Sequence, residues 1–380
     1  MKNKINLDNI FVFFFLVLFP FGQIIRIGII QPVDVIVGLA ALWAIVRRFE
    51  IPDFVKSFYP FLVLASFSWI LSIFIFHQMG VLYGLLYLIR LFAYLYFGIY
   101  IWNFVKTKTN NKKLLLDSLL VVSIVSALFG WIQFFTFPDL KPFFVWNWDM
   151  HLFRLVGTFL DPTFLGLIIV FGLIISIYRL VDKFNWKYLL ITAFLLISLA
   201  FTYSRASYLA FITAIFVIIF LNKKLKKLLF LAIGLIVIAF LLPTSRNHSI
   251  ELFRTFSAIA RIENYQTTLK IFSKSPVFGV GYDNMCIAYQ KYVGPQSFAS
   301  HACSGSDSSL LFILTTTGII GFMAFVFFVF RIRSSVLHST YYILLCVSFV
   351  ALLVHSLFSN SMFYPWIMGW MVILLAICGV

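Results

Sequence analysis

The chain has 380 residues, of which 62% are apolar and 11% are charged. Soluble domains are roughly half apolar and a quarter charged, so a water-facing surface cannot be built from the charge available here. The composition therefore excludes a soluble fold and predicts an all-α, polytopic membrane protein. In such a protein the net charge of +16 reflects topology and contact with anionic lipid rather than nucleic-acid binding.

Apolar runs of suitable length follow one another along the whole chain. A transmembrane helix needs about 20 mostly apolar residues, and twelve runs approach this size, some of them short. They are 10–25, 33–46, 58–76, 81–105, 114–137, 163–180, 188–203, 207–221, 228–242, 309–330, 341–358 and 363–378. We therefore expect about twelve transmembrane helices in one integral membrane domain, 1–380.

The basic residues predict the orientation of these helices. Of the 29 lysines and arginines, 18 fall in short connections on one side. They are Lys2, Lys4, Arg47, Arg48, Lys56, Lys106, Lys108, Lys112, Lys113, Arg179, Lys183, Lys187, Lys223, Lys224, Lys226, Lys227, Arg331 and Arg333. The positive-inside rule then places both termini in the cytoplasm and the long segment 243–308, between helices nine and ten, outside. Because the cytoplasmic loops are too small for chemistry, we expect any active site to face outward.

Two arginines stand at the outer ends of predicted helices. Asp161 followed by Pro162 is typical of a helix N-cap and first helical residue, and Arg154 lies a few residues upstream. Arg205 lies in the tight turn 203–207, beside the N-terminus of the next span. A guanidinium next to backbone N–H groups forms an anion site suited to phosphate. A snorkelling side chain is the alternative for Arg154, and a topology anchor is the alternative for Arg205.

The long outer segment contains an amphipathic pattern over 249–275. Arg254 and Arg261 share one side of a predicted helix. The opposite, apolar side consists of Leu252, Phe253, Phe256, Ile259 and Ile262. We expect this helix to pack on the bundle or to lie at the lipid interface, presenting both arginines as part of the active site. Solvation or contact with anionic lipid is the alternative explanation of their charge.

A histidine and an aspartate precede the tenth predicted span. His301 titrates near neutrality and is well matched to a general base, although a lone loop histidine is often only polar surface. Asp307 is the second candidate, and it also fits the N-cap of the following helix. The same outer segment holds Cys286 and Cys303, for which an oxidising compartment permits a disulfide.

The outer polar face is therefore rich in arginine and poor in acid. That combination suits a lipid-linked phosphate or pyrophosphate, whose tail stays in the bilayer while guanidinium groups hold the head group. A metal-dependent glycosyltransferase is expected to carry paired carboxylates outside, and the sequence contains no evident pair there. We predict no metal and no other cofactor.

In this order, the outer features resemble the O-antigen ligase and polymerase superfamily of bacterial envelope proteins. The matching stretches are Arg154-Leu-Val-Gly157-Thr158-Phe159 with Asp161-Pro162, then Ser204-Arg205-Ala-Ser207, then Arg261 with Pro276-Val-Phe-Gly279-Val-Gly281-Tyr282, and finally Asp307-Ser-Ser-Leu310 with Thr317-Gly318-Ile-Ile-Gly321. The resemblance implies a GT-C-type membrane glycosyltransferase in the bacterial cytoplasmic membrane. Such enzymes move a glycan from undecaprenyl pyrophosphate to an acceptor hydroxyl outside, without nucleotide sugar or metal.

The family pattern also implies roles for particular residues. Its arginines that match Arg205 and Arg261 hold the pyrophosphate, and a histidine at the head of the last motif is proposed as the base. The family histidine lies closer to the Thr-Gly glycine than His301 lies to Gly318, and Asp307 occupies the expected spacing. Spacing therefore favours Asp307 as the base, whereas intrinsic pKa favours His301. An aspartate here is typical of polymerase-like members, which favours polymerisation of surface polysaccharide over ligation to lipid A core.

These inferences combine into one predicted mechanism. The predicted pyrophosphate ligands are Arg205, Arg261, Arg154 and Arg254. Asp307 or His301 deprotonates the acceptor hydroxyl, and a single displacement inverts the anomeric carbon. The expected partners are the undecaprenyl-pyrophosphate-linked oligosaccharide, an acceptor glycan or glycolipid, membrane lipid and envelope-assembly proteins. A secondary transporter is the main rival, but the duplicated halves common in transporters are not evident, and a non-catalytic scaffold is a weaker third alternative.

Overall fold

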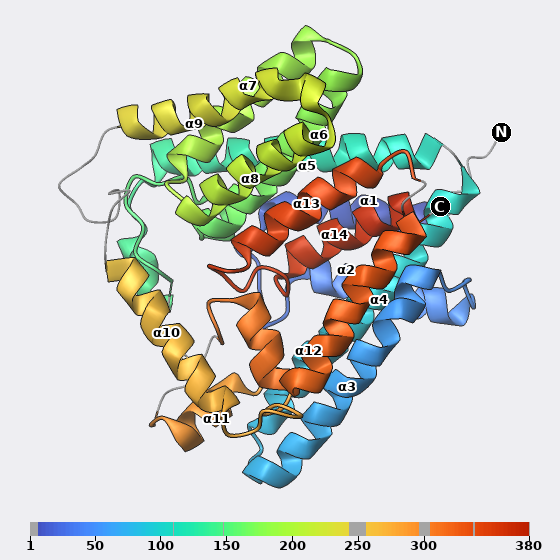
Figure 1. Cartoon of the computed structure of the whole chain (residues 1–380), viewed down its shortest axis with the longest axis vertical. Coiled ribbons are helices and arrows are strands. Elements are labelled where there is room, and N and C mark those ends of the chain that lie inside the picture. Colours follow the sequence, from blue (N-terminus) through green and yellow to red (C-terminus); the bar gives the residue numbers. More distant parts are fainter. Residues whose placement is uncertain are drawn as a thin grey trace. The chain divides into compact units, whose positions relative to one another are not determined.

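The computed structural model describes residues 7–108, 110–146, 148–242, 256–295, 305–336 and 339–379 (Figure 1). These residues are mostly helical; they form isolated β-bridges but no β-strand. Each predicted span overlaps a helix. By length and composition, five helical segments of the described chain can cross a membrane: Asp53–Phe76, Val81–Thr107, Asn110–Thr136, Pro162–Asp182 and Ser309–Ile332. These features support a polytopic helical membrane protein, and the membrane crossing of the shorter apolar helices stays a prediction.

The chain divides into two compact units, each assembled from separate sequence segments. The first unit comprises Met1–Ile36, Lys108–Arg254 and Tyr341–His355, and the second comprises Val37–Thr107, Thr255–Thr340 and Ser356–Val380. Arg154 and Arg205 therefore belong to the first unit, and Arg261 and Asp307 belong to the second. The prediction of a single domain over 1–380 stays a prediction.

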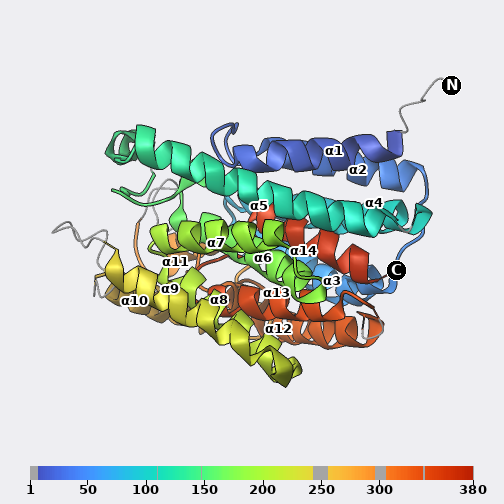
Figure 2. The same ribbon diagram turned by 90° about the horizontal axis from the view of Figure 1, so that it is seen from above.

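The first unit is built around one buried helix, α6 (Pro162–Asp182), which packs against its neighbours α5, α7, α8 and α13 (Figure 2). The other helices of the unit are α1 (Leu7–Leu18), η1 (Phe19–Phe21), α5 (Asn110–Thr136), η2 (Lys141–Trp146), η3 (Gly157–Phe159), α7 (Trp186–Phe201), α8 (Arg205–Leu221), η4 (Lys223–Leu228), α9 (Leu229–Leu241) and α13 (Tyr342–His355). Small residues allow this packing, since a Cβ on Gly166 would lie 2.4 Å from the Ser207 hydroxyl oxygen.

Short polar side chains begin several helices of this unit. The carboxylate of Asp161 accepts the amide N–H groups of Thr163 (2.6 Å) and Phe164 (3.3 Å), with Pro162 as the first helical residue. This confirms the N-cap predicted for α6. Asn185 caps α7 in the same way, through the amide of Lys187 at 2.9 Å. Such caps satisfy backbone N–H groups that have no partner within the helix.

The second unit pairs α3 (Asp53–Phe76) with α12 and α4 (Val81–Thr107) with α14 (Figure 1). Its further helices are α10 (Phe256–Phe272), α11 (Met285–Tyr292), α12 (Ser309–Val336) and α14 (Pro365–Cys378), and α2 (Pro32–Val46) runs from the first unit into the second. Phenylalanine rings join α3 to α12, with Phe58 and Phe328 centroids 4.7 Å apart and Phe61 and Phe325 centroids 5.6 Å apart.

Helix α12 is broken at Gly318, where φ is 70° and ψ is −176°. The loop that follows α10 fills the break. Its amides at Val280 and Gly281 donate to the carbonyls of Thr315 (3.0 Å) and Thr316 (3.1 Å), and Ile319 N–H donates to the carbonyl of Pro276 (2.9 Å). A broken helix in a membrane protein is tolerated where other protein groups satisfy the freed backbone. The loop 276–281 and the glycine of the Thr-Gly motif thus form one structural element.

The cysteine predictions have different outcomes. Cys286 is buried on α11 and is disulfide-bonded, as predicted, and its predicted partner Cys303 lies outside the described residues. Cys346 lies on α13 and Cys378 on α14, and both are free cysteines.

Candidate functional site

Arg205 is the first residue of α8, as the tight turn predicted. Ser204 precedes it, and the Ser204 hydroxyl accepts the amide N–H of Ser207 at 3.3 Å. The Arg205 side chain is half-buried at this helix start. Guanidinium charge and the positive end of a helix are therefore combined at one position, which favours an anionic ligand.

Arg154 has a structural position that the sequence did not indicate. Its side chain is only 2% exposed, and it donates from Nε to the carbonyl of Thr202 (3.0 Å) and from Nη2 to the carbonyl of Tyr203 (3.1 Å). Tyr203 has a positive φ of 51°, which is uncommon for a residue with a side chain. Arg154 thus holds the turn that carries Arg205, and we assign it a positioning role within this unit.

Replacement of Arg154 by alanine is expected to lower the thermal unfolding temperature of the purified protein by several degrees. The variant loses two charge-assisted hydrogen bonds, worth about 1.5–3 kcal/mol each, and leaves two buried carbonyls without these donors. Lys141→Ala, at an exposed position, serves as the control and should unfold like the wild type. An unchanged unfolding temperature combined with loss of donor binding would instead favour a direct ligand role for Arg154.

The neighbouring residues of the Arg154 motif are also engaged in the fold. The side-chain carbonyl of Gln133 accepts the amides of Val156 (3.1 Å) and Gly157 (3.2 Å), and the Thr158 hydroxyl donates to the carbonyl of Pro20 (2.5 Å). These contacts hold the segment before α6 in place.

His355, the last residue of α13, was missed by the sequence reading. It is fully buried, and its Nε2 lies 3.1 Å from the carbonyl oxygen of Thr163 and 3.3 Å from the Ser207 hydroxyl. The start of α6, the start of α8 and the end of α13 are thereby joined by one polar cluster. The sequence shows only that His355 stands near the end of an apolar run. Its partners, Thr163 and Ser207, are far away in sequence, so the cluster could not be predicted.

In the second unit, one face of α10 carries Arg261, Asn264 and Tyr265, which are spaced as neighbours on a helix surface. The Arg261 guanidinium lies over the ring of Phe358, with Cζ 5.9 Å from the ring centroid. Tyr265 donates its hydroxyl hydrogen to the carbonyl of Leu357. This face, and not the predicted apolar face, contacts the rest of the unit.

Two environments were expected for the apolar side of α10, the helical bundle or the lipid interface, and the exposure of its described residues does not fit the bundle. Ile259 and Ile262 are 51% and 54% exposed, respectively. Their exposure leaves the lipid interface as the environment that suits this face. Arg254 and the predicted helical residues before 256 lie outside the described residues, and so does His301.

Asp307 lies beside the α10 face. Its amide N–H donates to the side-chain oxygen of Asn264 at 2.9 Å, and the side-chain nitrogen of Asn264 donates to the carbonyl of Gly305 at 3.3 Å. The N-cap alternative for Asp307 is wrong, because α12 begins at Ser309 and the Ser308 hydroxyl accepts the Leu311 amide at 3.5 Å.

The Tyr265 phenol lies near the charges of Arg261 and Asp307. Burial raises the pKa of Tyr265 above its usual value, the guanidinium of Arg261 lowers this pKa, and the carboxylate of Asp307 raises it. Both charges therefore act on the same hydroxyl group. The structure brings together Arg261 and Asp307, two residues that the sequence nominated separately, and adds Asn264 and Tyr265.

Comparison with known protein families covers the segment that contains most of these residues. Residues 189–326 match the family model described as O-antigen ligase. This segment is similar to the O-antigen ligase family. The O-antigen ligase segment runs from within α7 to within α12 and includes Arg205, Arg261, Asp307 and the α12 break. The match confirms the predicted O-antigen ligase and polymerase superfamily, and it implies a glycosyltransferase-like membrane enzyme active in glycan transfer of this type. No curated protein matches the chain.

Proposed function

We propose that this protein transfers an undecaprenyl-pyrophosphate-linked glycan to an acceptor hydroxyl at the outer face of the bacterial cytoplasmic membrane. The favoured reaction is polymerisation of surface polysaccharide repeat units, and ligation to lipid A core is the alternative. The observation that carries the proposal is the arrangement of Arg261 and Asp307 around Tyr265 within the O-antigen ligase segment. A cation suited to phosphate and a carboxylate suited to proton transfer lie in one cluster.

The proposed reaction is a direct displacement at the anomeric carbon of the donor. The acceptor oxygen attacks this carbon, its proton passes to the Asp307 carboxylate, and the bond from the anomeric carbon to the pyrophosphate oxygen breaks. The electron pair of that bond leaves with the pyrophosphate, whose developing charge Arg261 stabilises. Arg205 remains a predicted pyrophosphate ligand. Attack opposite the leaving group inverts the anomeric configuration, and no metal takes part.

Asp307 is assigned as the base because Asn264 fixes its backbone. Its carboxylate is therefore held next to the face of α10 that carries Arg261. His301 is the alternative base. Substitution of Asp307 distinguishes the two assignments. Asp307→Asn should lose activity at every pH if the assignment to Asp307 is right.

Product analysis distinguishes the proposed reactions. The purified full chain in nanodiscs is incubated with a lipid-pyrophosphate oligosaccharide, alone and together with lipid A core, and the products are separated by size and identified by mass spectrometry. A ladder of longer glycans from the donor alone supports the polymerase. Transfer only to lipid A core shows a ligase. In proteoliposomes, uptake of the donor without any new glycosidic bond would contradict both reactions and favour a transporter.

A further inference from the structure

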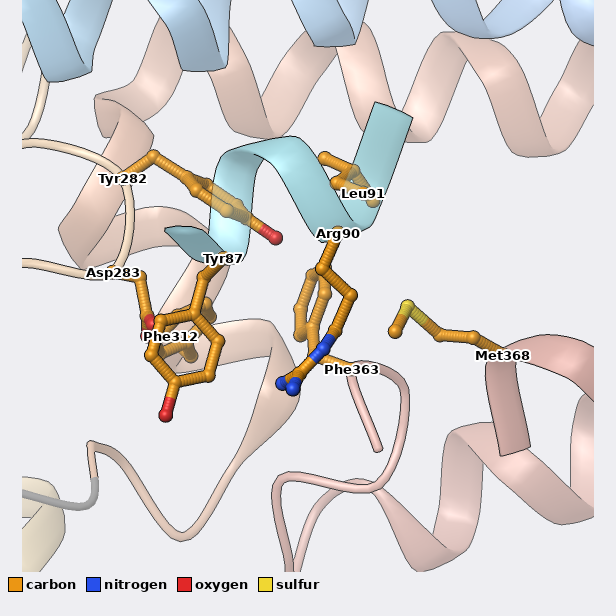
Figure 3. A pocket seen from close by; sticks show the side chains of 8 residues that line it. All are labelled: Tyr87, Arg90, Leu91, Tyr282, Asp283, Phe312, Phe363 and Met368. Carbon is orange, nitrogen blue, oxygen red and sulfur yellow. The ribbon is translucent and has the colours of Figure 1, made fainter. Parts of the chain in front are cut away.

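Arg90 is a charged residue within α4, a helix that can cross a membrane by its length and composition. A guanidinium at such a position is costly unless other groups of the protein compensate its charge. Figure 3 shows the Arg90 side chain pointing into a small space within the second unit, bordered by α4, α12, α14 and the loop before α11. The residues that line this space are Tyr87, Arg90, Leu91, Tyr282, Asp283, Phe312, Phe363 and Met368.

The space has room for about one water molecule, so no larger group of a substrate fits into it. Arg90 therefore acts on the protein itself. Its guanidinium lies over the Tyr87 ring, with Cζ 5.1 Å from the centroid. Burial raises the pKa of Asp283 to about 8, although the positive charge of Arg90 opposes this shift. At pH 7 the Asp283 carboxyl group is therefore mostly neutral, and an asparagine keeps its shape and polarity.

Asp283 belongs to the 276–284 segment, which lies between α10 and α11. The residue has a positive φ of 56°. Next to it, the side-chain nitrogen of Asn284 donates to the hydroxyl oxygen of Ser72 on α3 at 2.7 Å. The segment also touches α4, because a Cβ on Gly84 would lie 2.5 Å from the carbonyl oxygen of Tyr282. Asp283 thus lies where the segment is attached to α3 and α4.

Packed side chains connect this attachment to Asp307. Tyr282, the neighbour of Asp283, packs edge to face on Phe312, with ring centroids 6.1 Å apart. A Cβ on Gly305 would lie 3.4 Å from the Phe312 ring, so the backbone of Gly305 contacts that ring. Gly305 lies two residues before Asp307. Because close-packed interiors transmit strain, a shift at Asp283 reaches the backbone of Asp307.

We propose that Arg90 is a positioning residue for glycan transfer. Through Asp283 and the rings of Tyr282 and Phe312, it sets the position of Asp307. The inference rests on the proposed function for the role of Asp307 as the base. It gives the charge within α4 a function although no substrate reaches it.

Hydrogen–deuterium exchange of the purified full chain in nanodiscs tests this connection without any substrate. The probe is the Asp307 amide, whose hydrogen bond to the Asn264 side chain (2.9 Å) slows its exchange. Arg90→Met removes the positive charge, and Asp283→Leu removes the polar group. In both variants the Asp307 amide should exchange about fivefold faster, the effect of weakening one hydrogen bond. Asp283→Asn should exchange like the wild type at pH 7, because it reproduces the neutral carboxyl group.

Arg331→Met is the matched control. Arg331 lies at an exposed position of α12 in the same unit, and its guanidinium also lies over a ring, that of Phe327. This variant loses the same charge and should leave the exchange of the Asp307 amide unchanged. Phe312→Leu shortens the path of rings, keeps both polar groups and should also speed the exchange. It provides the result if Arg90→Met and Asp283→Leu do not fold, which thermal unfolding and size-exclusion elution establish.

Two exchange results would overturn the proposal. One is wild-type exchange of the Asp307 amide in the folded Arg90 and Asp283 variants, or in Phe312→Leu. The other is an equal rise of exchange in all helices of the second unit, because this would show a general loss of stability instead of a connection to Asp307.

Single-turnover glycan transfer on the same samples measures the consequence for the reaction. Arg90→Met and Asp283→Leu should each lower the rate constant by roughly 10- to 100-fold, the effect of a misplaced reacting group. Donor affinity should change less, and Asp283→Asn should keep the wild-type rate. The double variant should lose no more than either single variant, because both act through one attachment. Wild-type rates in variants with faster exchange would contradict the positioning role.

The two measurements also separate this inference from the proposed function. Transfer by the wild type together with unchanged exchange in the variants contradicts the positioning role alone. Faster exchange in the variants without any transfer by the wild type contradicts the proposed function alone.

Discussion

Arg261→Ala is expected to reduce glycan transfer by about 10²–10³-fold, the effect of removing one donor that stabilises transition-state charge. Arg261 presents its guanidinium from the face of α10 that also carries Tyr265, beside Asp307. When the pyrophosphate leaves, negative charge develops on its oxygens, and a fixed guanidinium lowers the energy of this state more than that of the bound donor. The rate constant should therefore fall more than donor affinity.

The measurement is single-turnover transfer by purified variants in nanodiscs with a lipid-pyrophosphate oligosaccharide. Lys270→Ala removes a positive charge from an exposed position on the same helix and controls for net charge. Arg261→Lys should recover only part of the activity, because an ammonium lacks the bidentate geometry of guanidinium. If folded Arg261→Ala transfers glycan at the wild-type rate, Arg261 has no role in stabilising the leaving group.

Gly318→Ala is expected to destabilise the protein severely, by about 3 kcal/mol or more from backbone strain and steric overlap. Gly318 has φ 70° and ψ −176°, a conformation that residues with a side chain rarely adopt. A Cβ there would also lie 2.1 Å from the carbonyl oxygen of Val277, within the loop that fills the α12 break. Relief of this overlap requires the loop to leave the break, which exposes backbone groups of α12.

Thermal unfolding of the purified protein tests this expectation. Gly38→Ala is the matched control, because a Cβ on Gly38 meets nothing within 4 Å and the residue lies inside helix α2. The control should unfold at the wild-type temperature or slightly above it, since alanine favours a helix over glycine by roughly 0.5–1 kcal/mol. Wild-type stability of Gly318→Ala would show that the break is not required for the fold.

Local signals predicted the helices and their polar starts well. Asp161 with Pro162 and Ser204 with Arg205 were correctly assigned to helix N-termini, because capping depends on residues close in sequence. The break at Gly318 was not predicted, since its backbone partners come from Pro276 to Gly281.

Residue roles that depend on tertiary contacts were less predictable. Arg154 was predicted as a pyrophosphate ligand, and its hydrogen bonds to the α7–α8 turn could not be predicted because their partners are far away in sequence. The apolar pattern of α10 did not identify the face that packs on protein, because lipid and protein satisfy an isoleucine such as Ile259 equally well. Asn264 and Tyr265 could have been found from their helical spacing to Arg261, whereas His355 required the fold.

The central claim is that a lipid pyrophosphate is the leaving group of a glycan transfer. The most direct test quantifies free undecaprenyl pyrophosphate and new glycosidic bonds in the same reaction of the full chain with its lipid-linked donor. The predicted result is one undecaprenyl pyrophosphate released for each bond formed, with both products lost together in Arg261→Ala. Glycosidic bond formation without release of undecaprenyl pyrophosphate, or no bond formation with a competent donor and acceptor, would contradict the claim.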